Sequence, residues 1–511
     1  MPILGSIIKG AIDLRGRIPA RKNIYKQQVK QLRKLLKKAE YTEFGKYYGF
    51  SNMLLEEDPV RSFQKNVPIH DYQSLFDGWW YKVLKGEKDI CWPGKVNYFA
   101  LSSGTSESSS KHIPVTRDMI KAIHRGTIMQ ILSTRNFNFL KEQYETEILF
   151  VGGSTNLNYN GIYFSGDLSG ITTGTLPRWF RGFSLPGPEI RGLKDWESKL
   201  QMMVDNAKNW NVGFICGVPA WIQILFERII KHYNLKSIHD IWPNLAIYVH
   251  GGVAIHPYKS SIDVLCAKPL IYLDTYLASE GFIAYQERPN PHQAMKLLTS
   301  NKMFFEFVPF NESNFDADGN ILPNAKALNI TEVELGKVYA LLISNTAGAW
   351  RYLIGDTVKF TNLKRCEIII TGRTKHFLSL CGEHLSVDNM NVAIKHTAED
   401  LGIHINEYCV VGKPFEGLFA HEWYVGADKN VDPKVIAETL DAYLKQLNDD
   451  YAVERHHALK SVWVNVLPND AFIEFLATKN KLGSQSKFPR VLKGKHLNEW
   501  MAFLQKYKTT A

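Results

Sequence analysis

From Tyr98 onward the sequence alternates short β-branched or aromatic runs with longer helix-like stretches. The runs include EILFVGG, VGFICGVP, LAIYVHGG, PLIYLDTY, KMFFEFVPF and KVYALLISN. Apolar runs of this length are typical of strands, and strands that alternate with helices favour a mostly parallel sheet with helices on both faces. The earlier segment IYKQQVKQLRKLLKKAEYTEFGKYYGF has apolar residues at helical spacing and ends near Gly49. We therefore expect a helical opening followed by an α/β fold.

A second α/β alternation follows GRTKHFLSLCGEHLS and includes EYCVVGK, HEWYVGA and SVWVNVL. The chain has 511 residues, of which 45% are hydrophobic, so it is long enough to bury more than one core. We place a domain boundary near Thr374, between a large unit over residues 1–374 and a small α+β unit over residues 375–511.

Composition and charge exclude several classes of function. The net charge of +10 is spread over 61 basic and 51 acidic residues without a block of like charges, so no nucleic-acid partner is expected. The six cysteines form no CxxC pair, which argues against a zinc site or a disulfide framework and favours a reducing cytoplasm. Lys9 and Asp13 interrupt the apolar start, and no later run reaches about 18 apolar residues. We expect neither secretion nor stable membrane insertion, although the start could touch a membrane weakly.

The stretch FALSSGTSESSSKHIPVT combines many hydroxyl side chains with Gly104 and Lys111. Such a composition is usual in a flexible linker, but hydroxyl donors, a glycine and a lysine also suit phosphate oxygens. The motifs GxxxxGK[ST], GxGxxG and HExxH are absent from the sequence. ALSSG approximates a nucleophile elbow, which leaves open that Ser102 is the nucleophile of a hydrolase.

A second candidate site lies at YLDTYLASEG, where a strand-like run ends in Tyr276, Ser279 and Glu280. Ligands of open α/β sheets collect beyond the carboxyl ends of strands, where Tyr276 could stack on a base and Glu280 could hold Mg²⁺. A core tyrosine and a glutamate at a helix N-terminus are the alternative. Upstream, YVHGGVAI ends in Gly251 and Gly252, where the backbone could approach a planar ring or simply turn.

A third candidate site is WRYLIGDTVKF, in which Asp356 follows a strand-like stretch and Gly355. A carboxylate there can accept hydrogen bonds from both hydroxyls of a ribose, whereas Arg351 is better explained by a structural role. The alternative is a β-hairpin turn.

Five segments resemble, in sequence order, the motifs of the auxin-responsive Gretchen Hagen-type acyl-acid amido synthetases, and the chain is similar to a bacterial-like member. The segments are LSSGTSESSSKHIP, TYLASEG, WRYLIGDTV, GRTKHFLSLCGEHLS and SKFPRVL, which together extend over essentially the whole chain. The family belongs to the adenylate-forming superfamily, which includes acyl-CoA ligases and luciferases. The resemblance implies that residues 1–374 bind ATP and the acyl group, and that residues 375–511 form a small mobile domain.

The resemblance also implies a role for each matching residue. The phosphate loop would comprise Ser102, Ser103, Gly104, Thr105 and Ser106, and Tyr276, Ser279 and Glu280 would serve adenine and magnesium. Asp356 would bind the ribose, Arg373 and Lys375 would form a basic pair at the hinge, and Lys487 would reach the phosphates. Two departures from the family pattern affect the expected pocket shape: the loop lacks the usual small-residue-plus-acid pattern before Lys111, and Leu277 replaces a smaller residue.

The implied activity has two halves and uses ATP with Mg²⁺. A carboxylate attacks the α-phosphorus of ATP and pyrophosphate leaves, while Lys487, Lys375 and Mg²⁺ on Glu280 offset the phosphate charge. An amine, expected to be an amino acid, then attacks the acyl-adenylate, forms an amide and expels AMP.

The remaining expectations concern the partners and the alternatives. A small carboxylic acid and an amino acid or other amine would be the partners of a monomer or weak dimer. Val218 and Trp221 are candidate walls of the acyl pocket, although a helix that faces the core explains them equally well. A thioester-forming acyl-CoA ligase, a Ser102 hydrolase and a non-catalytic nucleotide-binding protein stay open as alternatives.

Overall fold

The structure is a computed structural model that describes most of the chain. The described residues are 23–102, 111–137, 141–252, 255–316, 319–374, 377–378, 380, 383, 385–416, 418–428, 431–448, 451–452, 455–456, 459–479 and 488–510. Six residues of the expected site lie outside them: Ser103, Gly104, Thr105, Ser106, Lys375 and Lys487. Their expected roles stay predictions.

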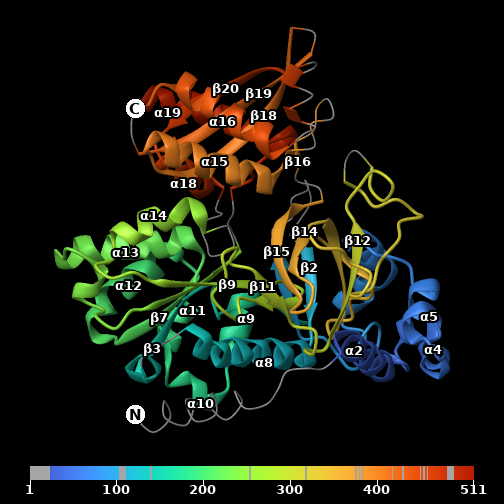
Figure 1. The fold of residues 1–511 in the computed structure, drawn as a ribbon. Coiled ribbons are helices and arrows are strands. Elements are labelled where there is room, and N and C mark those ends of the chain that lie inside the picture. Colours follow the sequence, from blue (N-terminus) through green and yellow to red (C-terminus); the bar gives the residue numbers. More distant parts are fainter. Residues whose placement is uncertain are drawn as a thin grey trace.

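The described part of the chain opens with short helices, as the sequence predicts (Figure 1). They are α2 (Ile24–Ala39), α3 (Glu43–Tyr47), α4 (Phe50–Leu55), α5 (Pro59–Asn66), α6 (Tyr72–Leu75), the π-helix η1 (Phe76–Trp80) and α7 (Tyr81–Leu84). Helix α2 buries Leu32, Leu35 and Leu36 on one face, in keeping with its apolar spacing. The helical pattern breaks before Gly49, which has a φ of 70° and separates α3 from α4.

The main sheet has eleven strands. In spatial order they are β12 (Met303–Pro309), β13 (Val338–Asn345), β14 (Tyr352–Asn362), β15 (Glu367–Arg373), β11 (Met295–Leu297), β10 (Gly281–Tyr285), β9 (Ile271–Ala278), β8 (Ile247–Gly251), β7 (Val212–Gly217), β3 (Glu147–Val151) and β6 (Ser184–Leu185). A smaller sheet has the order β2 (Lys111–Val115), β1 (Tyr98–Ser102), β5 (Phe164–Gly166) and β4 (Asn158–Tyr159).

The α/β architecture is confirmed, but the expectation of mostly parallel pairing holds for only one half of the main sheet. Strands β6, β3, β7, β8 and β9 pair in parallel, whereas the pairs from β9 to β12 are antiparallel. Parallel neighbours need a crossover of a dozen or more residues, and Ser279 and Glu280 alone join β9 to β10. The short connection therefore forces a hairpin there.

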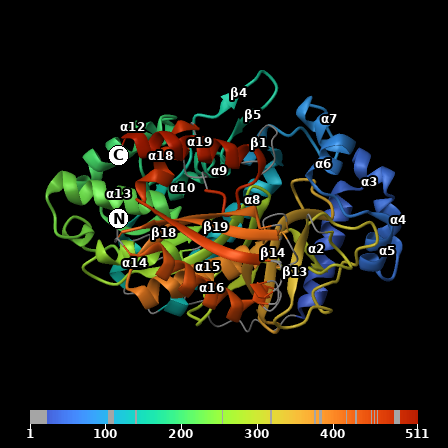
Figure 2. The same ribbon diagram turned by 90° about the horizontal axis from the view of Figure 1, so that it is seen from above.

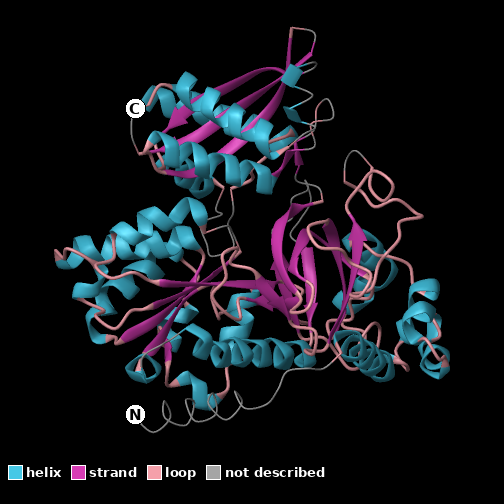
Figure 3. Cartoon of the chain, in the orientation of Figure 1, coloured by secondary structure: helices cyan, strands magenta, loops and turns pink. Residues whose placement is uncertain are grey.

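Helices cover both faces of the parallel half (Figures 1 and 3). Helices α12 (Trp196–Asn206), α13 (Pro219–Tyr233) and α14 (His256–Val264) lie on one face, where Phe226, Trp242 and Tyr248 are fully buried. Helix α8 (Arg117–Ser133) lies on the other face, with α9 (Leu168–Gly174) and α10 (Arg178–Arg181), while α11 (Pro188–Gly192) precedes α12. The strands of this half bury side chains on both faces of the sheet, and each face has its own apolar core.

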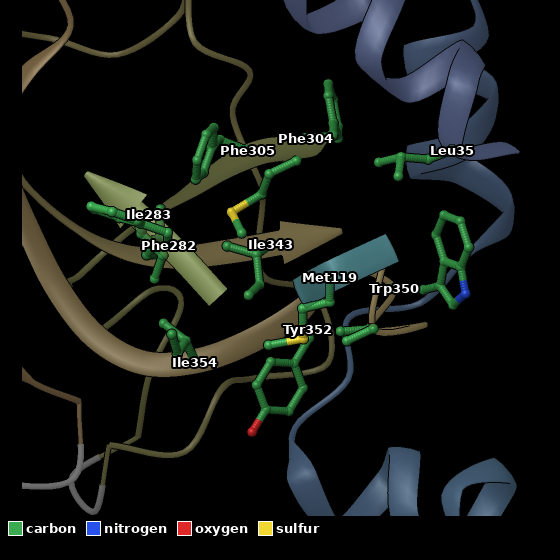
Figure 4. Close-up of a cluster of buried hydrophobic side chains, with 14 of the residues drawn as sticks. Leu35, Met119, Phe282, Ile283, Phe304, Phe305, Ile343, Trp350, Tyr352 and Ile354 are labelled. Carbon is green, nitrogen blue, oxygen red and sulfur yellow. The ribbon is translucent and has the colours of Figure 1, made fainter. Parts of the chain in front are cut away.

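The antiparallel half of the sheet packs on the N-terminal helices through a large apolar cluster. Figure 4 shows Leu35 of α2 near Phe304 and Trp350, with Phe305 further along β12 beside Ile283, and all of these side chains are buried. Arg351 also links the sheet to the N-terminal region: it forms an ion pair with Glu306 at 3.0 Å and donates to the backbone oxygen of Val67 at 2.7 Å. Both charged side chains are buried, so Arg351 has the structural role expected from the sequence.

The C-terminal part has its own sheet, in the order β18 (Ile405–Phe415), β19 (Leu418–Ala427) and β20 (Leu459–Leu467). This sheet has an apolar core on each face, because side chains alternate along β18. Tyr408 and Val410 pack in the core with α15 (Val387–Leu401) and α16 (Pro433–Leu447). Cys409 and Val411 pack in the core with α18 (Asp470–Thr478) and α19 (Gly494–Thr510). The short pair β16 (Phe377–Leu378) and β17 (Leu385–Ser386) precedes this sheet. Figures 1 and 2 show the C-terminal part lying across the top of the larger part.

Strand β15 of the main sheet ends at Arg373, and Leu378 already packs in a C-terminal core. The domain boundary near Thr374 and the mobility of the C-terminal part stay predictions. Within the described ranges, no helix is both long enough and apolar enough to span a membrane.

Candidate functional site

Three of the predicted site residues meet where β9, β14 and β15 end or bend. The Tyr276 hydroxyl donates a hydrogen bond to Asp356 Oδ2 at 2.5 Å, and Arg373 Nε lies 3.1 Å from Asp356 Oδ1. Asp356 and Arg373 are direct partners in the register of β14 and β15, which explains the second contact. Residues that are 80 positions apart in the chain thus form one polar cluster.

The Asp356 carboxylate remains able to bind a ligand. Each of its oxygens has two acceptor positions, and one hydrogen bond from Tyr276 and one contact from Arg373 leave others open. The negative charge of Asp356 raises the pKa of Arg373, which keeps the guanidinium charged. The Asp356 carboxylate can therefore accept hydrogen bonds from sugar hydroxyls while Tyr276 and Arg373 hold it in place.

Glu280 lies beside this cluster in the turn between β9 and β10. Its side chain is buried, and the Tyr352 hydroxyl donates to its Oε1 at 3.3 Å. Burial raises the pKa of Glu280 to about 7, and the negative charge of Asp356 adds to the rise, whereas Arg373 and Lys111 lower it. A buried carboxylate beside a second carboxylate favours binding of a cation.

The chain supplies few further ligands for a metal at this position. Within the described residues, no cluster of three or more His, Cys, Asp or Glu side chains is placed to hold a metal ion. Mg²⁺ often binds one or two carboxylates and takes its other oxygen ligands from water and from substrate phosphates. Glu280 fits that kind of site, which depends on a bound nucleotide.

Gly251 and Gly252 lie at the end of β8, beside the same cleft. A Cβ atom on Gly251 would lie 2.4 Å from the backbone oxygen of Thr275, so no side chain fits there. Gly252 has a φ of 85°, in the left-handed region that favours glycine. Ser279, in the turn after β9, also lines the cleft. The predicted residues at these strand ends therefore share one cavity.

The Ser-rich stretch joins β1 to β2. The structure describes the backbone of Ser102, which pairs with Lys111 across the two strands. Lys111 Nζ lies 5.2 Å from the centre of the Tyr72 ring, and its charge lowers the pKa of Glu280. The base of the predicted phosphate loop is thus close enough to act electrostatically on the predicted metal ligand.

Val218 and Trp221 lie at the start of α13, and both line the cleft. Trp221 is only 6% exposed and its ring packs on Trp196, with the ring centres 4.7 Å apart. Trp221 is therefore a core residue, as one explanation from the sequence has it, and it also lines the cleft. The acyl-pocket role of Val218 and Trp221 stays a prediction.

The final motif, SKFPRVL, is described from Phe488 onward. Phe488 packs on Trp500 with the ring centres 5.0 Å apart, and the backbone oxygen of Arg490 accepts a hydrogen bond from Val410 N at 2.8 Å. The Arg490 side chain binds Glu407 at 2.5 Å, and the Tyr258 hydroxyl of α14 donates to the same carboxylate. The motif is therefore fixed to β18 and linked to the larger part of the chain.

Both parts of the chain line one cleft of about 2710 Å³. Tyr276, Asp356 and Arg373 lie on the side of the main sheet, and Phe488 and Arg490 lie on the side of the C-terminal part. The residue that precedes Phe488 in the sequence is Lys487.

Sequence reasoning missed Tyr352 and Asn345, which position Glu280. Asn345 donates from its side chain to the backbone oxygen of Glu280 at 2.7 Å, and Tyr352 donates to the Glu280 carboxylate. Tyr352 lies four residues before Asp356 within the motif, and side chains at even separations along a strand share a face. That spacing is the signal that could have identified Tyr352, whereas nothing in the local sequence singles out Asn345.

Comparisons with known proteins identify the family and the fold. Three family models match: the GH3 family N-terminal domain at residues 19–176, the GH3 family central domain at residues 296–372 and the GH3 family C-terminal domain at residues 388–496. The chain is 22% identical over 454 residues to a jasmonoyl–L-amino acid synthetase of Nicotiana attenuata, and the aligned region covers 74% of each protein. It is 23% identical over 358 residues to an indole-3-acetic acid-amido synthetase of Arabidopsis thaliana, which covers 63% of this chain and 55% of the relative.

Two solved structures share the fold. An acyl acid amido synthetase, solved in complex with 2,4-DB, superposes with a TM-score of 0.77 at 15% identity and covers 98% of this chain and 96% of its own. A 2-hydroxyisobutyryl-CoA ligase in the postadenylation state superposes with a TM-score of 0.58 at 12% identity, over 94% of this chain and 91% of the ligase. At these identities the similarity establishes the architecture alone.

Proposed function

We propose, from the premise that this chain belongs to the GH3 family, that it is an ATP-dependent acyl-acid amido synthetase. It adenylates a carboxylic acid, releases pyrophosphate, transfers the acyl group to an amino acid and releases AMP. The observation that carries the proposal is the cluster of Tyr276, Asp356 and Arg373 beside the buried Glu280, because it offers hydroxyl acceptors and a metal ligand in one cleft.

In the first half-reaction, the main sheet would hold the nucleotide. Asp356 would accept the ribose hydroxyls, Tyr276 would lie against the adenine, and the glycines at the end of β8 would allow its close approach. Glu280 would bind Mg²⁺, which neutralises charge on the phosphates. Lys487, Lys375 and the hydroxyl-rich loop at 102–106 would stabilise the charge that develops as the acid oxygen attacks and pyrophosphate leaves.

In the second half-reaction, the amine of an amino acid attacks the carbonyl carbon of the acyl-adenylate. The C–O bond to the phosphate breaks, the amine loses a proton, and AMP leaves. Because residues of the C-terminal part line the cleft together with the main sheet, this part would exclude water that could hydrolyse the adenylate. Its rotation about Arg373 and Lys375 between the two halves is part of the proposal.

The acyl-CoA ligase alternative is favoured by one observation, the shared fold with a CoA ligase. Exchange of labelled pyrophosphate into ATP, measured across a panel of carboxylic acids, tests the common first step. The proposal requires exchange that depends on an acid, followed by amide formation with an amino acid. Thioester formation with CoA and none with amino acids would favour the alternative, and a covalent acyl adduct on Ser102 would favour a hydrolase.

We expect the magnesium requirement of the enzyme to depend on pH through Glu280. Mg²⁺ binds the ionised carboxylate, and the pKa of Glu280 is raised to about 7, so the apparent affinity falls as the pH drops below that value. The expected decrease is about tenfold per pH unit well below pH 7, with a plateau above it. The measurement is the magnesium dependence of pyrophosphate exchange at several pH values between about 6 and 8.5.

Two variants complete this test. Glu280→Gln should weaken the magnesium dependence and remove the part of its pH dependence that Glu280 causes. The exposed Glu334→Gln is the matched control, and it should retain the wild-type profile, including the titration of ATP itself. If Glu280→Gln and Glu334→Gln gave the same magnesium profile at every pH, Glu280 would not be the metal ligand.

A further inference from the structure

A buried lysine that the proposed reaction does not use lines a small recess next to the cleft. Lys199 of α12 is only 2% exposed, and its Nζ donates to the backbone oxygen of Gly152 at 3.2 Å. Burial lowers the pKa of Lys199 to about 8. An ammonium group has three donors, so the contacts within the described residues leave two of them without an acceptor.

A carboxylate at the residue directly before α9 lines the neighbouring part of the cleft. Asp167 lines the cleft, and its side chain makes no hydrogen bond to any described residue. The carboxylate lies against Gly153, where an added Cβ would be 2.2 Å from Asp167 Oδ2. Asp167 and Lys199 influence the pKa of each other, but neither forms an ion pair within the described part of the chain.

A recess of about 10 Å³ lies beside Lys199. Phe150, Gly152 and Thr173 line both this recess and the main cleft, so the recess adjoins the cleft. Arg191 also lines it, and the Nε atom of Arg191 is buried without a hydrogen-bond partner. A space of this size holds about one water molecule or one oxygen-bearing group.

The recess lies next to the wall proposed for the acyl pocket. The Trp221 ring packs on Trp196, and Lys199 Nζ lies 5.6 Å from the centre of the Trp196 ring. Strand β3, which ends beside Lys199, is three positions from β9 in the sheet, which corresponds to about 14 Å. A group in the recess would therefore be remote from a carboxylate activated near Glu280, which follows β9.

We propose that the acyl acid of this enzyme carries a hydroxyl group at the end remote from its carboxylate, and that Lys199 and Asp167 recognise it. The hydroxyl oxygen accepts a hydrogen bond from Lys199, with Arg191 Nε as a second donor, and the hydroxyl proton is donated to Asp167. A second carboxylate would be too large for the recess and would be repelled by Asp167. The inference rests on the proposed function, since it concerns the acid that is adenylated.

The test compares pairs of acids in the pyrophosphate-exchange assay. Each pair consists of an aliphatic or arylalkanoic acid and its analogue with a hydroxyl group at the remote end. In at least one pair, the wild-type enzyme should prefer the hydroxylated acid by about tenfold in kcat/KM, the effect of one or two hydrogen bonds. The keto analogue, which accepts but does not donate, should fall between the two.

Variants connect the preference to the recess. Lys199→Met keeps the length and apolar packing of the side chain, and Asp167→Asn keeps its shape, so each should lose most of the preference while exchange with the unsubstituted acid persists. Lys194→Met is the control. Lys194 is exposed and donates to Asn158 at 2.7 Å, so this variant should retain the preference.

Failure of the inference and failure of the proposed function give different results. Exchange with unsubstituted acids but no preference for the hydroxylated member of any pair would overturn the inference alone. The same holds if Lys199→Met and Asp167→Asn both retained the wild-type preference. If no acid supported exchange by the wild-type enzyme, the proposed function would be wrong and the inference would be overturned with it.

Discussion

Replacement of Lys487 by alanine is expected to raise the barrier to acyl-adenylate formation by about 2–4 kcal/mol, which slows that step roughly 30- to 900-fold. The reason is the loss of one positive charge held against the phosphates as pyrophosphate leaves. Amide formation from a supplied acyl-adenylate should change little, because that half-reaction has no pyrophosphate leaving group. The two half-reactions are measured separately on the same variant.

The described neighbours of Lys487 make this effect reasonable. Phe488 and Arg490 line the cleft that also contains Asp356, and Arg490 is tied to Glu407. The lysine is therefore next to a segment that faces the nucleotide site from the C-terminal part. Lys460→Ala, on an exposed lysine of the same part, is the matched control and should leave both half-reactions intact. Equal damage to both half-reactions by Lys487→Ala, or damage to neither, would refute the role.

Asp356→Ala is expected to lower kcat/KM for ATP by about 2–3 kcal/mol, or roughly 30- to 150-fold, mainly through a higher KM. The variant loses the proposed ribose contacts and leaves Tyr276 and Arg373 without their shared partner. The loss should be the same at every magnesium concentration, because Asp356 is assigned to the sugar and Glu280 to the metal. Steady-state kinetics at several ATP and magnesium concentrations measure it.

The conservative variant Asp356→Asn separates shape from charge. It retains one acceptor oxygen, so its KM for ATP should lie between those of the wild type and of Asp356→Ala. Thermal unfolding of both variants checks that the fold persists. A wild-type KM for ATP in Asp356→Ala, or a defect that added magnesium repairs, would show that the ribose assignment is wrong.

Sequence motifs predicted which residues share a site better than they predicted how the strands pair. Tyr276, Asp356 and Arg373 are all predicted to bind ATP, and they meet because Asp356 and Arg373 are register partners on β14 and β15 and Tyr276, near the end of β9, donates to Asp356. The prediction of parallel strands was wrong for the half of the sheet from β9 to β12, because apolar runs look alike in parallel and antiparallel sheets. The short connection at Ser279 and Glu280 was the signal for a hairpin.

Other parts of the site depend on long-range packing that local patterns do not reveal. Asn345 contacts Glu280 from a strand 65 residues further along the chain. A lysine in an amphipathic helix is usually exposed, so nothing in the local sequence indicates that Lys199 is buried beside Gly152. Burial of such a residue follows from the way α9 and α12 enclose the end of β3, which only the folded chain shows.

The central claim is that the acid is activated as an acyl-adenylate and then passed to an amine. The most direct measurement supplies the best acid of the exchange panel with oxygen-18 in its carboxylate, together with ATP and an amino acid, and analyses the products by mass spectrometry. Adenylation forms a bond between a carboxylate oxygen and the α-phosphorus, and attack by the amine breaks the bond on the carbon side. The account therefore predicts one oxygen-18 atom in AMP and one in the amide, whereas label in inorganic phosphate with ADP as product, or unlabelled AMP, would contradict it.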